Sequence, residues 1–448
     1  MPIEWSLRTL GQRCVWVTAL MGVLGAAAAT AAEPPILPAD SGARFLGVET
    51  CGSSACHASR EAWGNATVSM KERLIWQAHD AHAKAFTGLT AAAGKGIATK
   101  LGLADASQAP ECLVCHTTFV PAAQRGPLFD LRSGVGCESC HGPGASFLSA
   151  HVQPTAQHAS NIAAGMYPTN QPAARAALCL SCHQGDTVRK MTHAIYGAGH
   201  PRLRFELDTY GALQPYHFVA DADYRRRKPT ASHFRLWAEG QLRAAQQLLA
   251  QAEAAHGRGV FPELANYDCH ACHRGINDDV AYRPRPGVRS GSPSLNDAPL
   301  VLLRGLAAVT TPAQVAGLRD DTRALQGVLG DPQARGRVVT QLKQRLSALA
   351  SDLAARTEQP GDTHAVTAAL LIEAHGEMPL SFTAAESVAM SIATLVTAEY
   401  EQQRLPAERY HAAGAAIDEV YATIANERTY QPTIFVAALD KVASVLGQ

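Results

Sequence analysis

Four copies of the motif Cys-x-x-Cys-His occur in the first two-thirds of the chain. They are Cys112, Cys115 and His116; Cys137, Cys140 and His141; Cys179, Cys182 and His183; and Cys269, Cys272 and His273. This spacing is the attachment signature of a c-type haem, in which two thiols form thioether bonds to the vinyl groups of the porphyrin. The adjacent histidine then lies beneath the iron as its proximal ligand. The motifs therefore predict four sites for haem c.

A fifth site, formed by Cys51, Cys56 and His57, has four residues between its cysteines instead of two. The longer gap fits either an enlarged attachment loop or a single thioether bond from Cys56. The cysteine count favours five paired sites, because five pairs use all of the 11 cysteines except Cys14. We number the sites 1 to 5 in chain order, so that site 1 contains His57 and site 5 contains His273.

Paired cysteines have two other common uses in proteins. Cys-x-x-Cys pairs also build structural zinc sites with four cysteine ligands, and the thiols of exported proteins often form disulfides. Neither use explains why a histidine directly follows every pair. We therefore expect about five haems, with His57, His116, His141, His183 and His273 as proximal iron ligands.

The histidine supply is large enough to place a second histidine on each iron. The chain has 18 histidines, of which five belong to the motifs. A lone histidine is most often a surface residue, so each candidate distal ligand needs its own argument. Ten candidates lie in the cysteine-containing region: His79, His82, His151, His158, His193, His200, His217, His233, His256 and His270.

Three stretches of this region carry further patterns. They are Trp76-x-x-x-Asp80-x-His82-x-x-Ala85, then Gly134-Val135-Gly136-Cys137-Glu138-Ser139-Cys140-His141-Gly142-Pro143 with His151 soon after, and Ala198-Gly199-His200-Pro201-Arg202-Leu203-x-Phe205-Glu206-Leu207. Together they make about residues 45–280 resemble the multihaem cytochrome family of the cytochrome c-554 type. The chain departs from the family's four-haem members in its fifth haem site, in the longer gap of site 1 and in its additional C-terminal region.

The resemblance implies that His82 and His151 are distal ligands to haems other than those attached beside them. His200 is similarly placed, before a proline that restricts the backbone, and His193 fits as a fourth ligand. His217 is our fifth candidate, although a plain surface histidine is the alternative there.

Two other histidines have different expected roles, and one haem has an alternative coordination. His79 is the main rival of His82, and His270, inside the site 5 motif, is interpreted as a spacer. The family includes members with an open iron, so one haem with a single histidine ligand remains an alternative.

The N-terminus is typical of a secretory signal peptide, which we expect to span residues 1–32. Arg8 and Arg13 precede an apolar run, and Thr30-Ala31-Ala32 ends it with small residues. A permanent anchor is the alternative, but the run is short for a span of about 20 apolar residues. We therefore expect cleavage, no stable membrane span and a periplasmic or otherwise exported protein.

The rest of the chain is expected to be mostly α-helical with extensive loops. We expect a pentahaem cytochrome domain at residues 33–285, a Pro/Gly/Ser-rich linker at 286–295 and a helical domain without cysteine at 296–448. A long helix is predicted from Ser232 to about Ala255, and the spacing of Thr383 and Glu386 predicts a capping box. One apolar stripe with helical spacing supports a bundle: Val339, Leu342, Leu346, Leu349 and Leu353.

Composition and crowding decide among the functions considered. The 39 basic and 39 acidic side chains balance, which gives no reason to expect a nucleic-acid partner. Five haems in about 230 residues must lie close together, so we expect an electron carrier that serves redox partner proteins. The alternatives are an oxidoreductase with one open haem acting on a small nitrogen or sulfur species, and a filament-forming cytochrome. The oligomeric state is left open.

Overall fold

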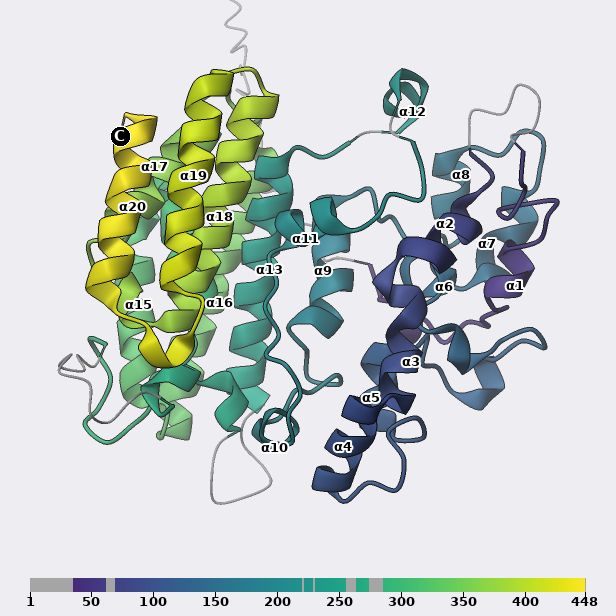
Figure 1. Ribbon diagram of the computed structural model, residues 1–448, viewed down its shortest axis with the longest axis horizontal. Coiled ribbons are helices and arrows are strands. Elements are labelled where there is room, and N and C mark those ends of the chain that lie inside the picture. The colour runs from purple at the N-terminus through teal and green to yellow at the C-terminus, as the bar shows by residue number, and fades with distance from the viewer. Residues whose placement is uncertain are drawn as a thin grey trace, which may run out of the picture. The chain divides into compact units, whose positions relative to one another are not determined.

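Helices joined by long loops make up the protein in the computed structural model (Figure 1), which describes residues 35–61, 69–219, 221–228, 230–254, 263–273 and 285–447. Within these ranges the only extended pairings are two isolated bridges, Phe45 with Arg125 and Tyr267 with Leu295. The expectation of a mostly α-helical fold with extensive loops is confirmed. The leader expected at residues 1–32 lies outside the described residues, and so does His256. None of the described helices is long and apolar enough to cross a membrane.

The region that carries the cysteines consists of short helices. Pro110 and Pro172 stand in the first turns of two of them, where a missing backbone N–H costs nothing. The α-helices are α1 (Val48–Cys51), α2 (Glu72–His79), α3 (Ala85–Thr90), α4 (Ala92–Leu101), α5 (Pro110–His116), α6 (Cys137–His141), α7 (Gly144–His151), α8 (His158–Ala163), α9 (Pro172–His183), α10 (His193–Gly197), α11 (Leu207–Leu213) and α12 (Ala222–Arg227). The 3₁₀ turns are η1 (Pro38–Asp40), η2 (Ala81–Lys84), η3 (Ala122–Gln124), η4 (Leu131–Ser133), η5 (Leu264–Asn266) and η6 (Cys269–Ala271).

Longer helices follow and pack into a bundle (Figure 1). They are α13 (His233–Ala254), α14 (Ala298–Thr310), α15 (Val315–Val328), α16 (Pro332–Ala355), α17 (Asp362–Glu373), α18 (Phe382–Glu401), α19 (Ala407–Thr423) and α20 (Pro432–Leu446), with the turns η7 (Pro312–Gln314), η8 (Met378–Leu380) and η9 (Glu427–Thr429). The five apolar residues predicted to share one face of α16 are all buried in the main core, so that prediction is confirmed.

Helix α13 takes part in two hydrophobic cores, and it matches the long helix predicted at this position. It packs against α14, α16 and α18 of the bundle and against α9 of the cysteine-containing region. Trp237 is fully buried, and its indole Nε1 donates to Ser391 Oγ of α18 at 2.9 Å. Ala244 joins a smaller cluster with Leu180 and Leu207. Because α13 serves both cores, the division at residues 286–295 stays a prediction.

The capping box predicted at Thr383 and Glu386 is wrong. Helix α18 begins at Phe382, and Ser381 caps it by accepting a hydrogen bond from the backbone N–H of Ala384 at 3.2 Å. Glu386 instead accepts from Arg202 Nη2 at 2.8 Å. Two hydroxyl residues lie near the start of this helix, and the sequence pattern alone did not identify which of them has the capping geometry.

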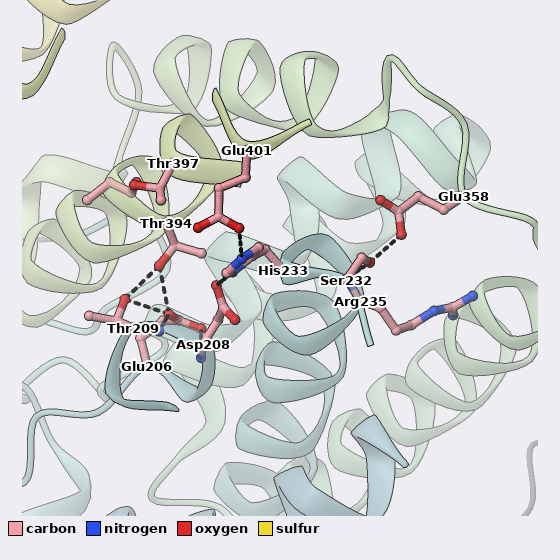
Figure 2. A network of polar contacts seen from close by, with 11 residues as sticks. Glu206, Asp208, Thr209, Ser232, His233, Arg235, Glu358, Thr394, Thr397 and Glu401 are labelled. Carbon is pink, nitrogen blue, oxygen red and sulfur yellow. Dashed lines mark hydrogen bonds and ion pairs between the residues drawn. The ribbon is translucent and has the colours of Figure 1, made fainter. Parts of the chain in front are cut away.

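A network of polar contacts joins α11, α13 and α18 (Figure 2). The Nδ1 of His233 lies 2.7 Å from Asp208 Oδ2, and its Nε2 lies 2.8 Å from Glu401 Oε2. Glu206 accepts from the backbone N–H groups of Asp208 and Thr209 and thereby caps α11. The hydrogen bond to Asp208, opposed by burial and supported by Glu401, raises the pKa of His233 to about 9.

The His233→Gln variant is expected to lower the free energy of unfolding in a pH-dependent way. Since the folded pKa is raised to about 9 from an ordinary value of about 6.5, the stabilisation is complete below the lower value and disappears as pH rises through the upper one. Denaturant titrations followed by helical circular dichroism at pH 6, 8 and 10 will measure it. His411→Gln, at an exposed position of α19, is the control. A deficit of equal size at all three pH values would contradict the prediction.

Candidate cofactor sites

Each of the five motif histidines faces one other histidine ring. The distances between ring centroids are 5.9 Å for His57 and His151, 5.9 Å for His183 and His82, 6.2 Å for His116 and His200, 6.1 Å for His141 and His217, and 6.1 Å for His273 and His193. The five partner rings belong to the residues that the sequence analysis proposed as distal ligands. Among the described residues, His79 and His270 form no such pair with a motif histidine.

The separation of these rings fits one metal ion between each pair. A metal-bound imidazole nitrogen lies about 2 Å from the ion, so two nitrogens on opposite sides of it are about 4 Å apart. Each nitrogen lies roughly 1 Å from its ring centre, as C–N bonds of about 1.3 Å require, which gives about 6 Å between the centres. The five observed distances of 5.9 to 6.2 Å agree with this value.

Helix ends and tight turns position the motif histidines. Helices α5, α6 and α9 each end on the histidine of site 2, 3 or 4. In site 5 the backbone N–H of His273 donates to the carbonyl of Cys269 at 2.8 Å. In site 1 the N–H of His57 donates to the carbonyl of Cys51 at 3.1 Å, although two more residues separate them. The longer gap of site 1 therefore keeps the same closing hydrogen bond and places its extra residues in a bulge.

Four of the paired histidines use Nδ1 for a hydrogen bond to an oxygen. His57 Nδ1 lies 3.0 Å from Glu72 Oε2, and His82 Nδ1 lies 2.9 Å from Asp80 Oδ1. Backbone carbonyls serve the pair of site 2, at 3.0 Å from His116 Nδ1 to Ala85 O and at 2.7 Å from His200 Nδ1 to Pro201 O. A proton on Nδ1 leaves the lone pair on Nε2, which is the tautomer that a metal requires.

A buried amide beside His151 supports the same tautomer. Asn161 Nδ2 lies 3.1 Å from His151 Nδ1, while Asn161 Oδ1 is buried without a hydrogen-bond partner. The oxygen and nitrogen of an amide have nearly the same shape, and turning the group over exchanges them. With Oδ1 turned toward His151, the amide accepts from Nδ1–H and the orphaned oxygen gains a partner. His151 Nε2 is then free to bind a metal ion.

Burial keeps several of the paired rings neutral. It lowers the pKa of His141 to about 4 and that of His183 to about 4, and it also lowers the pKa of His116, His151 and His217. In every case the main cause is loss of water around the charged form. Neutral imidazole is the form that binds metal ions, so at neutral pH these rings are ready to act as ligands.

The attachment sites are close neighbours. Cys182 Sγ lies 4.0 Å from the carbonyl oxygen of Val114, which directly precedes Cys115, so sites 2 and 4 are side by side. Cys51 interacts electrostatically with Cys137, and Cys140 with Cys179. Site 3 is therefore adjacent to both site 1 and site 4.

A cavity of about 530 Å³ borders site 4. His183 and Phe205 lie in its wall, and their rings stack with centroids 4.4 Å apart. Lys190 and Arg204 line it too. Asp186, Glu206, Glu263 and Glu386 also line the cavity, so acidic side chains outnumber the basic ones in its wall.

Sequence reasoning missed several residues that hold the paired histidines. Glu72 and Asn161 were not singled out, and neither was Gln214, whose Nε2 donates to Asp80 Oδ2 at 2.9 Å. Only Asp80 had a local signal, because it stands two residues before His82 in the motif that carries the family resemblance. Glu72 lies 15 positions from His57, Asn161 lies 10 positions from His151, and Gln214 lies 134 positions from Asp80, so no short motif links any of them to its partner.

Comparison with known proteins yields one match. Residues 51–142, which contain sites 1, 2 and 3, match the family model for cytochrome c554 and c-prime. No curated protein and no solved structure is similar enough to count as a match. The family match supports a haem-based electron-transfer role. Residues 51–142 are therefore similar to a cytochrome c-type family.

Proposed function

We propose that the protein is an exported electron carrier with five covalently bound c-type haems, each held by two histidines. The observation that carries the proposal is that all five motif histidines face a second histidine at 5.9 to 6.2 Å. Haem c supplies a one-electron couple between Fe(III) and Fe(II). The ten motif cysteines would hold the five groups, and the leader and the family match support export to the periplasm.

The pairing favours a carrier over an oxidoreductase. An enzyme that binds a small nitrogen or sulfur species at iron needs one axial position free. That arrangement predicts at least one motif histidine without a ring opposite it, whereas each of the five has one. Two imidazoles on each iron would leave the protein able to exchange electrons with partner proteins but unable to bind substrate there.

The neighbour relations support a continuous electron path. Sites 1 and 3, 3 and 4, and 4 and 2 have cysteines close enough to interact. Tyr196 extends the series, because its ring centroid lies 6.4 Å from that of His200 at site 2 and its hydroxyl interacts with Cys269 at site 5. The proposed order along the path is therefore 1, 3, 4, 2 and 5.

The holoprotein is expected to contain five haems per processed chain and only low-spin iron when oxidised. Intact mass with a pyridine haemochrome assay will give the number, and electron spin resonance will give the spin states. His217→Ala should convert one haem of the five to high spin because it removes a distal ligand. His79→Ala, at an exposed position without a ring partner, is the matched control. High-spin iron that binds nitrite or nitric oxide in the unchanged protein would favour the oxidoreductase.

The Asp80→Asn variant is expected to raise the midpoint potential of one haem. The Asp80 carboxylate accepts from His82 Nδ1, and an anionic acceptor makes the imidazole a stronger donor to oxidised iron. Loss of the charge should raise the equilibrium constant for reduction about tenfold, which corresponds to roughly 59 mV for one electron. A potentiometric titration will measure it, with Asp105→Asn on an exposed loop as the control. An unchanged set of five midpoints would show that Asp80 does not act on the iron through His82.

A further inference from the structure

Site 5 lies outside the family match, and its backbone is fastened to the segment that leads into the C-terminal helices. Tyr267 forms an antiparallel bridge with Leu295. The N–H of Asp268 donates to the carbonyl of Ser294 at 2.8 Å, and the N–H of Asn296 donates to the carbonyl of Asn266 at 3.0 Å. Leu295 is itself part of the main core with the bundle. Backbone hydrogen bonds therefore join the residues just before Cys269 to the segment that leads into the bundle.

The side chain of Asp268 makes a second connection. Asp268 directly precedes Cys269, and only 3% of it is exposed. Its Oδ1 accepts from Thr383 Oγ1 at 3.4 Å, and the Ser381 hydroxyl also bonds to the carboxylate. Both hydroxyl residues lie at the start of α18. A buried carboxylate needs such donors, so the attachment turn and the first turn of α18 depend on each other.

His270, which lies between the two cysteines of site 5, contacts aromatic residues of the bundle. Its ring centroid is 5.6 Å from that of Tyr430 and 6.2 Å from that of Phe382. Phe382 is fully buried, and the Tyr430 hydroxyl donates to the carbonyl of Pro379 at 2.7 Å. His270 was interpreted from the sequence as a spacer. In the structure its ring contacts the rings of Phe382 and Tyr430 in the bundle.

The distal side of the site is held in a related way. The backbone N–H of His193 donates to Glu263 Oε1 at 2.7 Å, so the partner ring is tied to the segment that leads into site 5. Further along, Arg202 Nη2 pairs with Glu386 of α18 at 2.8 Å, and its guanidinium lies over the Phe382 ring at 5.2 Å. Glu263 therefore holds His193, and Arg202 joins the chain that follows His193 to α18.

Sites 1 to 3 are built differently. Their motif helices pack against other short elements of the cysteine-containing region: α1 against α6, α6 against η1, and α5 against α3. These elements are mostly contained in the stretch that matches the family. The bundle and site 5 are both outside that stretch, and the contacts above join one to the other.

We propose that the C-terminal bundle, residues 298–446, is the scaffold that holds the fifth haem. Asp268 and His270 are the positioning residues on the attachment turn, and Ser381, Phe382, Thr383 and Tyr430 receive them. The proposal rests on the proposed function, because it takes site 5 to bind haem c. Its consequence is that the bundle fixes the last haem of the path beside Tyr196, through which it meets site 2.

Two variants of the full-length holoprotein test the scaffold. His270→Ala removes the inserted ring and keeps the attachment motif, and Tyr430→Leu removes the aromatic edge that receives it. Both should admit water to site 5, which stabilises the more highly charged oxidised iron and lowers the midpoint of one haem. We expect the equilibrium constant for reduction of that haem to fall about tenfold. Hydrogen exchange should become faster in peptides covering residues 263–273 and stay unchanged around site 3.

Tyr410→Leu is the matched control, because Tyr410 stacks on Tyr400 elsewhere in the bundle with ring centroids 4.2 Å apart. It should leave all five midpoints and the exchange of residues 263–273 unchanged. The haem count separates the two proposals. Four haems in the unchanged protein, with none attached to Cys269 and Cys272, would overturn the function proposed for site 5. Five haems whose midpoints and local exchange do not respond to His270→Ala or Tyr430→Leu would overturn the scaffold alone.

Discussion

Two imidazole rings held about 6 Å apart form the arrangement on which the rest of the structure depends, and five of the ten rings are also bonded through Nδ1. A ring pair at this distance has no direct hydrogen bond between its members, so the surrounding chain must hold both rings in place. The chain does so with helix ends for the motif histidines and with carboxylates, carbonyls or an amide at Nδ1. Short helices and long loops follow from this, because ten rings must converge in pairs from many directions.

The distribution of buried apolar side chains agrees with a region organised around paired histidine rings. The main hydrophobic core lies in the bundle and α13, whereas each of the two described clusters in the cysteine-containing region has only four buried residues. A region of that length needs more apolar contact than such clusters offer. Under the proposed function the faces of the haems supply it, which also explains why the loops there carry so little helical periodicity.

Local patterns were predictable from the sequence, and contacts between distant residues were not. The motifs, the buried stripe of α16 and the extent of α13 depend on residues a few positions apart. The family resemblance suggested His82, His151 and His200, and His193 and His217 were further candidates, but the pairing of these histidines required the structure. Glu72, Asn161 and Gln214 have no local signal, since each reaches its histidine or carboxylate through the fold. The wrong capping box shows that this limit also applies to neighbouring residues. Ser381 and Thr383 both have side chains that can cap a helix, and only the backbone geometry decides which of them does.

Helix α13 gives the bundle and the cysteine-containing region a common reference. At site 4, Gln184 Nε2 donates to the carbonyl of Ala244 at 3.0 Å, and Gln251 Nε2 of α13 donates to the carbonyl of Gly185 at 2.8 Å. Gln184 and Gly185 directly follow the motif histidine His183. The same helix contacts η5, which leads into site 5, and it is joined to α18 through Trp237. Electron transfer between sites requires fixed spacing more than motion, and a long helix that touches the supports of two sites provides it. Under the proposals made above, the bundle continues the scaffold of the cofactor sites, and helix packing holds it together.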